Sequence, residues 1–233
     1  MSGVPKDLII TIDGPVAAGK TTAARLLSER LGYRHIDSGS MYRALAWKAM
    51  QAGIDLANVT MLLDLLARTA FEFQPGPEGF RVLVDGEDVT DVLRLPRTGT
   101  AASILSIHPH VREELVKRQR ELGAGGGVVM DGRDIGTVVF PYAPVKFYLT
   151  ASPEERGRRR FQESPQETGN LEGTLAEVER RDRRDIERPA SPLKPAPDAI
   201  FIDTTFLSAE EVVKEMEGHI QRRLKKPCDF FLA

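Results

Sequence analysis

The chain of 233 residues lacks paired cysteines, long apolar runs and clustered histidines. Its one cysteine, Cys228, excludes an intramolecular disulfide framework and a cysteine-based zinc finger. The apolar run at residues 8–12 is too short for a signal-peptide core or a membrane span. The four histidines are scattered without metal-ligand spacing. We therefore expect a cytosolic protein with no membrane partner and no histidine-bound metal.

An excess of charge of either sign is also missing. Lysine and arginine number 32 and aspartate and glutamate 34, so the net charge of −2 is far from that of a general nucleic-acid binder. The hydrophobic content of 41% and the charged content of 28% exclude disordered, collagen-like and transmembrane classes. Among the 32 cations, however, 23 are arginine. A guanidinium group offers a planar fork of donors that matches phosphate, which hints at phosphate recognition, although a GC-rich genome would give the same excess.

The strongest signal is a glycine-rich loop between an apolar strand and a helix. Residues 14–21 read GPVAAGKT and satisfy the pattern G-x-x-x-x-G-K-[ST], directly after the apolar run and before a helical pattern that Gly32 ends. In such a loop the backbone N–H groups curl around phosphate oxygens, the lysine reaches the β- and γ-phosphates, and the next hydroxyl ligates Mg²⁺. The predicted phosphate-binding residues are Gly14, Pro15, Val16, Ala17, Ala18, Gly19, Lys20, Thr21 and Thr22, with Thr21 as the metal ligand.

A phosphate-binding loop occurs in GTPases, motor ATPases and small-molecule kinases. The Asn-Lys-x-Asp element with which GTPases read their base is missing from the sequence. A motor ATPase would carry an Asp-Glu pair at a strand end, whereas the apolar strand at residues 128–131 runs into Gly132-Arg133-Asp134. A small-molecule kinase therefore fits best. A protein that senses ATP without transferring phosphate is the alternative from another class.

Apolar strands alternate with helices along most of the chain. This alternation predicts an α/β fold of the P-loop type, with a parallel sheet covered by helices on both faces. Between residues 71 and 93, short alternating strands predict a small antiparallel sheet inserted among the helices. We expect a polar turn at residues 37–40 and one arginine-rich helical stretch at 153–188. The tail at residues 225–233 has no role that the sequence supports.

Four segments, in order, resemble bacterial cytidylate kinases, which are P-loop nucleoside monophosphate kinases. The segments are GPVAAGKTT, DSGSMYR at residues 37–43, VMDGRDIGTVVFPYAPVKFYL at 129–149 and RRDRRDIERPASPL at 180–193. The resemblance implies a single domain over residues 1–233, with an arm for the nucleoside monophosphate at about 38–112 and a lid at about 153–188. It also implies that a monomer transfers the γ-phosphoryl group of ATP to CMP or dCMP, with Mg²⁺ as cofactor.

The same resemblance places residues around the acceptor nucleotide. Those near the monophosphate are Ser38 and Arg43, and Tyr42 packs against the substrate. Those that face the cytosine ring are Ser103, Arg112 and Asp134. Cytosine presents acceptors at O2 and N3 and a donor at its 4-amino group, so Arg112 donates to the first two and Asp134 accepts from the third. This set argues against a related kinase for UMP, AMP, dTMP or shikimate. Taken alone, Ser38 is a helix N-cap, Arg112 an ion-pair partner within its own helix, and Asp134 a partner of Arg133.

Charged residues near the end of the lid complete the expected site. Arg181, Asp185 and Arg188 occur at i, i+4 and i+7, so a helix projects all three from one face, although a solvated charged helix has the same pattern. By the resemblance, Asp185 contacts the sugar. The attacking phosphate oxygen is ionised at neutral pH, so we expect no general base and do not assign that role to Asp131 or Asp134. The same resemblance places Arg133, Arg181 and Arg188 around the phosphates and the substrate, so these three and Lys20 are expected to act in catalysis. The lid arginines Arg156, Arg158, Arg159 and Arg160 are not ranked.

Overall fold

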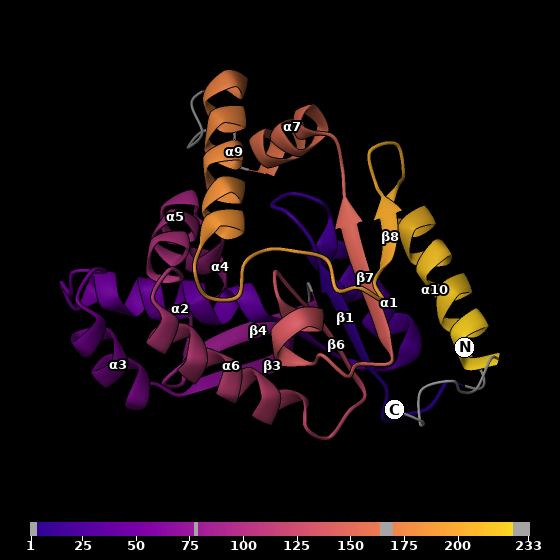
Figure 1. Cartoon of the computed structure of the whole chain (residues 1–233). Coiled ribbons are helices and arrows are strands. Elements are labelled where there is room, and N and C mark those ends of the chain that lie inside the picture. The colour runs from indigo at the N-terminus through magenta and orange to yellow at the C-terminus, as the bar shows by residue number, and fades with distance from the viewer. Residues whose placement is uncertain (1–3, 77–78, 164–169, 226–233) are drawn as a thin grey trace.

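A five-stranded parallel sheet forms the centre of the molecule (Figure 1). This computed structural model describes residues 4–76, 79–163 and 170–225. The strand order is β2-β6-β1-β7-β8, and the register sets Asp13, at the end of β1, opposite Gly132 of β6 and Tyr148 of β7. The carboxyl ends of the strands therefore share one edge, which is where open α/β sheets bind ligands. The strands are β1 (Ile9–Asp13), β2 (Arg34–Asp37), β6 (Val128–Gly132), β7 (Val145–Thr150) and β8 (Ile200–Asp203).

Helices cover both faces of this sheet. On one face α1 (Lys20–Leu31) and α10 (Ala209–Lys225) pack on apolar side chains of β1 and β7. On the other face α6 (Pro109–Gly123) and the π-helical turn η1 (Ile135–Val139) pack on β2 and β6. The predicted fold class is confirmed. Within the part of the chain that the structure describes, no helix has both the length and the apolar character needed to cross a bilayer.

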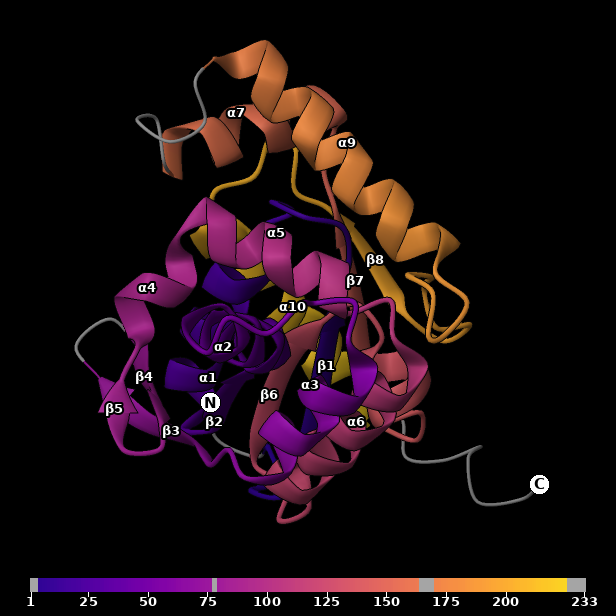
Figure 2. The same ribbon diagram turned by 90° about the vertical axis from the view of Figure 1, so that its left-hand side faces the viewer.

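A second unit of helices and a small sheet lies beside the central sheet (Figure 2). One apolar cluster joins its helices to α6, and another joins α2 to the small sheet through Trp47, Val82 and Leu93. The inserted antiparallel sheet is therefore confirmed, with strand order β3-β4-β5. The elements of this unit are α2 (Ser38–Gln51), α3 (Val59–Ala67), β3 (Phe71–Gly76), β4 (Gly79–Val84), β5 (Glu87–Asp88), α4 (Thr90–Arg94) and α5 (Pro96–Leu105).

Two local predictions in this unit are wrong, both where an Asp side chain accepts a hydrogen bond from the backbone at the start of a helix. The third expected strand stops at Asp88, whose Oδ1 accepts hydrogen bonds from the backbone N–H of Thr90 at 3.0 Å and from its hydroxyl at 2.6 Å, and α4 follows. The expected turn at residues 37–40 is the first turn of α2, because the Asp37 carboxylate accepts from the backbone N–H of Ser40 at 3.2 Å. Asp, Ser and Thr favour turns and N-caps for the same hydrogen-bonding reason, so the sequence pattern did not separate the two.

The described residues of the arginine-rich stretch are mainly helical, as expected, and include two helices on either side of residues 164–169. These are α7 (Pro153–Glu163) and α9 (Leu171–Glu187), which pack against each other above the carboxyl ends of the strands (Figures 1 and 2). Asn170 begins α9 by accepting a hydrogen bond from the backbone N–H of Gly173 at 2.7 Å. Residues 164–169 of the predicted helix lie outside the described residues.

Candidate active site

The loop between β1 and α1 has the backbone of a phosphate cradle. Gly14 adopts φ +148°, and a Cβ there would lie 2.0 Å from the carbonyl oxygen of Leu149, so only glycine fits. Gly19 is left-handed at φ +80° and begins α1 without a side-chain cap. The N–H groups of the first turn of α1 are therefore not used by a capping side chain and, with the helix dipole, favour an anion.

Lys20 is the buried cation of this loop. Its side chain is inside the loop, where Nζ donates to the carbonyl oxygen of Pro15 at 2.5 Å. Burial, helped by the positive charge of Arg133, lowers the pKa of Lys20 to about 7. A bound polyanion would oppose both effects and favour the charged ammonium.

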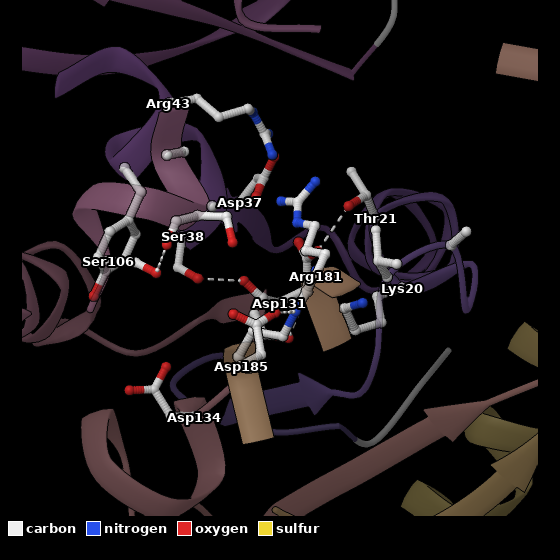
Figure 3. Close-up of a pocket in the computed structure, with 18 of the residues that line it drawn as sticks. Lys20, Thr21, Asp37, Ser38, Arg43, Ser106, Asp131, Asp134, Arg181 and Asp185 are labelled. Atoms are coloured by element: carbon white, nitrogen blue, oxygen red, sulfur yellow. Dashed lines mark hydrogen bonds and ion pairs between the residues drawn. The ribbon is translucent and has the colours of Figure 1, made fainter. Parts of the chain in front are cut away.

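Asp131, near the end of β6, connects the loop to the first turn of α2. Its Oδ2 accepts from the Thr21 hydroxyl at 2.8 Å, and its Oδ1 lies 2.7 Å from Nε2 of His35. The Ser38 hydroxyl donates to the backbone carbonyl of Asp131 at 2.7 Å, so Asp131 lies between Thr21 and Ser38 (Figure 3). The sequence analysis gave Asp131 no role and did not single out His35. The signal in the sequence that could have identified Asp131 is its place near the end of the apolar strand at residues 128–131, which pairs with the strand before the phosphate loop.

Asp134 and Arg112 form a buried ion pair in the cavity. Asp134 Oδ2 lies 2.5 Å from a terminal nitrogen of Arg112, and their exposed fractions are 4% and 2%. The guanidinium of Arg112 also lies over the Tyr42 ring at 5.2 Å and donates to the carbonyl of Ser106 at 3.3 Å. Arg112 thus pairs across the site rather than within its helix. Asp134 pairs with Arg112 and lies 3.8 Å from Arg188, so the alternative pairing with Arg133 is wrong.

Arg133 pairs instead with the acidic residue of α9. Its Nε donates to Asp185 Oδ2 at 2.9 Å, and Arg188 lies 3.4 Å from the other oxygen of Asp185. Arg181 lines the same cavity, and burial together with the nearby charge of Arg133 lowers its pKa to about 10. The i, i+4, i+7 set therefore faces the cavity, and the solvated-helix alternative is wrong.

The four arginines of α7 make different contacts. Arg156 is buried and pairs with Asp182, which also accepts from the backbone N–H of Val16 at 3.0 Å. Arg159 donates to the carbonyl of Thr204 at 2.6 Å. Arg158 is exposed and pairs with Glu155 of its own helix. Of these four arginines, only Arg160 lines the central cavity.

The central cavity has a volume of about 210 Å³, and more cationic than acidic side chains line it. Figure 3 shows part of this lining, with Lys20, Arg181 and Asp185 among the labelled residues. Seven cationic side chains line the cavity against five carboxylates. Ser103 also lines it, and Ser103 Oγ is buried with no hydrogen-bond partner among the described residues. A ligand with negative charge at one end and polar groups at the other would satisfy both features. The cationic lining residues are Lys20, Arg43, Arg112, Arg133, Arg160, Arg181 and Arg188, and the carboxylates are Asp37, Asp131, Asp134, Glu163 and Asp185.

The parallel sheet, the phosphate loop and the cation-lined cavity define a P-loop kinase. The chain belongs to the cytidylate kinase family, because the model of that family matches residues 10–222. It is 52% identical to the cytidylate kinase of Geobacillus kaustophilus (strain HTA426) over 217 residues, which cover 92% of this chain and 97% of that one. It is 46% identical to the cytidylate kinase of Bacillus subtilis (strain 168) over 220 residues, or 94% and 98% of the two chains.

A solved structure supports the fold independently of close sequence similarity. The gluconokinase from Sinorhizobium meliloti 1021 aligns with a TM-score of 0.54 and 12% identity, over 95% of this chain and 96% of that one. At this identity the likeness shows the fold alone. The family resemblance read from the four sequence segments is confirmed by the family match and by the close relatives.

Proposed function

We propose that this chain transfers the γ-phosphoryl group of ATP to CMP or dCMP, giving ADP and the nucleoside diphosphate. One observation carries the choice of acceptor: the buried Arg112–Asp134 pair lies in the same cavity as the phosphate loop. A guanidinium beside a carboxylate matches the acceptors and the amino donor of cytosine, whereas uracil has the opposite polarity at two positions. Membership of the cytidylate kinase family supports the same acceptor.

The residues at the phosphate end act by positioning and charge. Lys20 holds the β- and γ-phosphates while Arg133 and Arg181 neutralise the charge that spreads over the transferred group. Arg43 and Ser38 hold the phosphate of the acceptor, for which Arg43 exchanges its present contact with Asp37. The attacking phosphate oxygen is already ionised, so no residue needs to remove a proton from it.

The sugar and base lie toward α9 and α5. Asp185, held by Arg133 and Arg188, accepts from the sugar hydroxyls. The Ser103 hydroxyl, which is buried with no hydrogen-bond partner among the described residues, would bind a polar group of the cytosine ring. Tyr42 supports the Arg112 guanidinium from below through its ring. These contacts orient the acceptor so that its phosphate lies in line with the γ-phosphate, which is where most of the rate enhancement in such reactions arises.

A magnesium ion fits the oxygen ligands beside the loop. The Thr21 hydroxyl and the Asp131 carboxylate lie 2.8 Å apart, and hard oxygen donors are the ligands that Mg²⁺ prefers. Among the described residues no group of three metal-ligating side chains exists, so phosphate oxygens and water would complete the coordination. Thr21 would bind the ion directly. The ion would neutralise charge at the β- and γ-phosphates.

The arm at about 38–112 and the lid at about 153–188 are proposed to enclose the two nucleotides from opposite sides. Of the four arginines of α7, Arg160 is the one that would contact the enclosed nucleotides, because it lines the central cavity. The monomeric state and the cytosolic location expected from the sequence stay predictions.

A coupled assay of ADP release with CMP, dCMP, UMP, AMP and dTMP as acceptors tests the proposed function. CMP and dCMP should give the highest kcat/KM. Lys20→Ala should remove several kcal/mol of transition-state stabilisation, at about 1.36 kcal/mol for each tenfold in rate, and leave the fold intact. Stable ATP retention without acceptor-dependent ADP release would favour the nucleotide sensor instead.

A further inference from the structure

Asp13 connects the phosphate loop to the segment that carries Asp134. It is the last residue of β1 and directly precedes Gly14. Its side chain is 3% exposed and reaches across the sheet edge to η1. Oδ1 accepts from the backbone N–H of Ile135 at 2.8 Å, and Oδ2 accepts from that of Gly136 at 2.7 Å. One buried carboxylate thus binds both N–H groups at the start of η1.

This contact replaces a cap that the neighbouring residue would otherwise supply. The first N–H groups of any helical turn lack acceptors within the turn, and Asp is among the residues that most often cap them from the preceding position. Asp134 occupies that position, yet its side chain makes no capping hydrogen bond and pairs with Arg112 instead. The Asp134 carboxylate cannot both cap η1 and pair with Arg112. Asp13, at the end of β1, supplies the cap in its place.

Close packing keeps η1 within reach of Asp13. A Cβ on Gly136 would lie 2.8 Å from Thr11 Oγ1 and 3.3 Å from Asp13 Oδ2. Thr11 lies on the same face of β1 and its hydroxyl has no hydrogen-bond partner among the described residues. Thr11 and Asp13 therefore both border the space beside Gly136, and of the two only Asp13 has a hydrogen bond to the backbone of η1.

We propose that Asp13 is a positioning residue for base recognition: by capping η1 from β1, it leaves the Asp134 carboxylate available to Arg112 and to the acceptor base. The identity of that base rests on the proposed function. When the cap is lost, Asp134 turns to the N–H groups of η1 and its contact with Arg112 breaks. The choice of base then weakens although no residue that touches the base has been changed.

The protonation of Asp13 provides a readout that needs no substitution. Burial, the largest cause, raises the pKa of Asp13 to about 7, against the two N–H donors of η1; the charge of Asp134 raises it further and that of Lys20 lowers it. On the adjoining strand β7 the titratable group opposite Asp13 is the Tyr148 phenol. A protonated carboxyl group is a poorer double acceptor, so the cap weakens as the pH falls below about 7.

The experiment compares kcat/KM for CMP with kcat/KM for UMP between pH 6 and pH 8. Both nucleotides carry the same phosphate, so the ratio cancels its titration and that of Lys20. Asp13→Asn should lower the CMP-to-UMP ratio at pH 8 by about tenfold, because one buried contact with the base is lost. In the parent, the CMP-to-UMP ratio should decrease as the pH is lowered from 8 to 6. In Asp13→Asn this ratio should be independent of pH. Thr11→Val, the matched control on the same strand face, should keep the parent ratio.

A double variant separates positioning from general damage. Asp13→Asn combined with Asp134→Asn should have the ratio of Asp134→Asn alone, because both changes act through the same contact. An unchanged ratio in folded Asp13→Asn, or additive effects in the double variant, would overturn the inference while leaving the proposed function in place. A parent that uses CMP and UMP equally would overturn both. Melting temperature and ADP affinity show that each variant is folded with an intact phosphate loop.

Discussion

Replacing the Asp134 carboxylate by the amide of asparagine tests how the acceptor base is recognised, because this carboxylate is the group proposed to accept from the cytosine amino group. Asp134 is 4% exposed and lies 2.5 Å from Arg112, so solvent has little access to compensate for a poor contact. Uracil carries an N–H at position 3 and a carbonyl at position 4, so it meets Arg112 with a donor and Asp134 with an acceptor. Each buried mismatch costs about 1–3 kcal/mol, so the parent should favour CMP over UMP by on the order of a hundredfold or more in kcat/KM.

Asp134→Asn removes one of the two mismatches. The amide has the size of the carboxylate and donates to the uracil carbonyl, so UMP should gain while CMP loses. The CMP-to-UMP ratio should narrow by about fivefold to about 150-fold, which is about 1–3 kcal/mol expressed as a ratio. Arg112 and Arg188 also lose a buried counter-ion, so the variant should melt at a lower temperature.

The coupled ADP-release assay measures kcat/KM for both nucleotides in the parent, in Asp134→Asn and in Lys20→Ala. Lys20→Ala is the control, because the loop lysine contacts no base and its loss should damage both reactions alike. The variants are compared below their melting temperatures. An unchanged ratio in folded Asp134→Asn would refute the proposed hydrogen-bond pattern, and the acceptor base would then be recognised elsewhere.

ATP binding should draw a proton onto Lys20, whose pKa burial lowers to about 7, so ATP affinity should fall as the pH rises above about 7. Calorimetry at pH 7 in buffers of different ionisation enthalpy should detect this uptake, and equal uptake by Lys20→Met would contradict it. Gly14→Ala should abolish nucleotide binding, because its methyl group would meet the Leu149 carbonyl at 2.0 Å, whereas Gly125→Ala points into open space and should bind ATP normally. A bisubstrate analogue should slow hydrogen exchange in the arm at residues 71–93 and in the lid near 156–170, of which 77–78 and 164–169 lie outside the described residues. No change in either segment would exclude closure from two sides.

The parts of the fold that depend on local signals could be predicted from the sequence. The phosphate loop is encoded by spaced glycines and a lysine between an apolar strand and a helix, and the parallel sheet by alternating apolar strands. The fold class and the inserted antiparallel sheet followed from these patterns. The start of α4 could not be distinguished from a strand, because Thr90 is β-branched and its hydrogen bonds to Asp88 become visible only with the backbone in place.

Contacts between distant segments were beyond the sequence patterns. In the sequence, acidic residues of the same helix were the expected partners of Arg112. The packing of α6 against β6 brings Arg112 to Asp134 instead. The burial of Arg156 beside Asp182 depends on how α7 crosses α9, which no spacing rule gives. The capping of η1 by Asp13 joins residues about 120 positions apart in the chain, and no local preference predicts such a bond.

The surplus of cations around the cavity bears on how ligands of this protein should be screened. Six arginines and Lys20, whose pKa is lowered to about 7, share the cavity lining with five carboxylates, so a small anion relieves the repulsion among the cationic side chains. Sulfate, citrate or pyrophosphate in a buffer would raise the melting temperature by mass action. A thermal-shift screen would therefore rank compounds by charge and conceal preferences for the base. Screens should be run in chloride buffers at constant ionic strength, with inorganic pyrophosphate as the reference from which a nucleotide's specific contribution is measured.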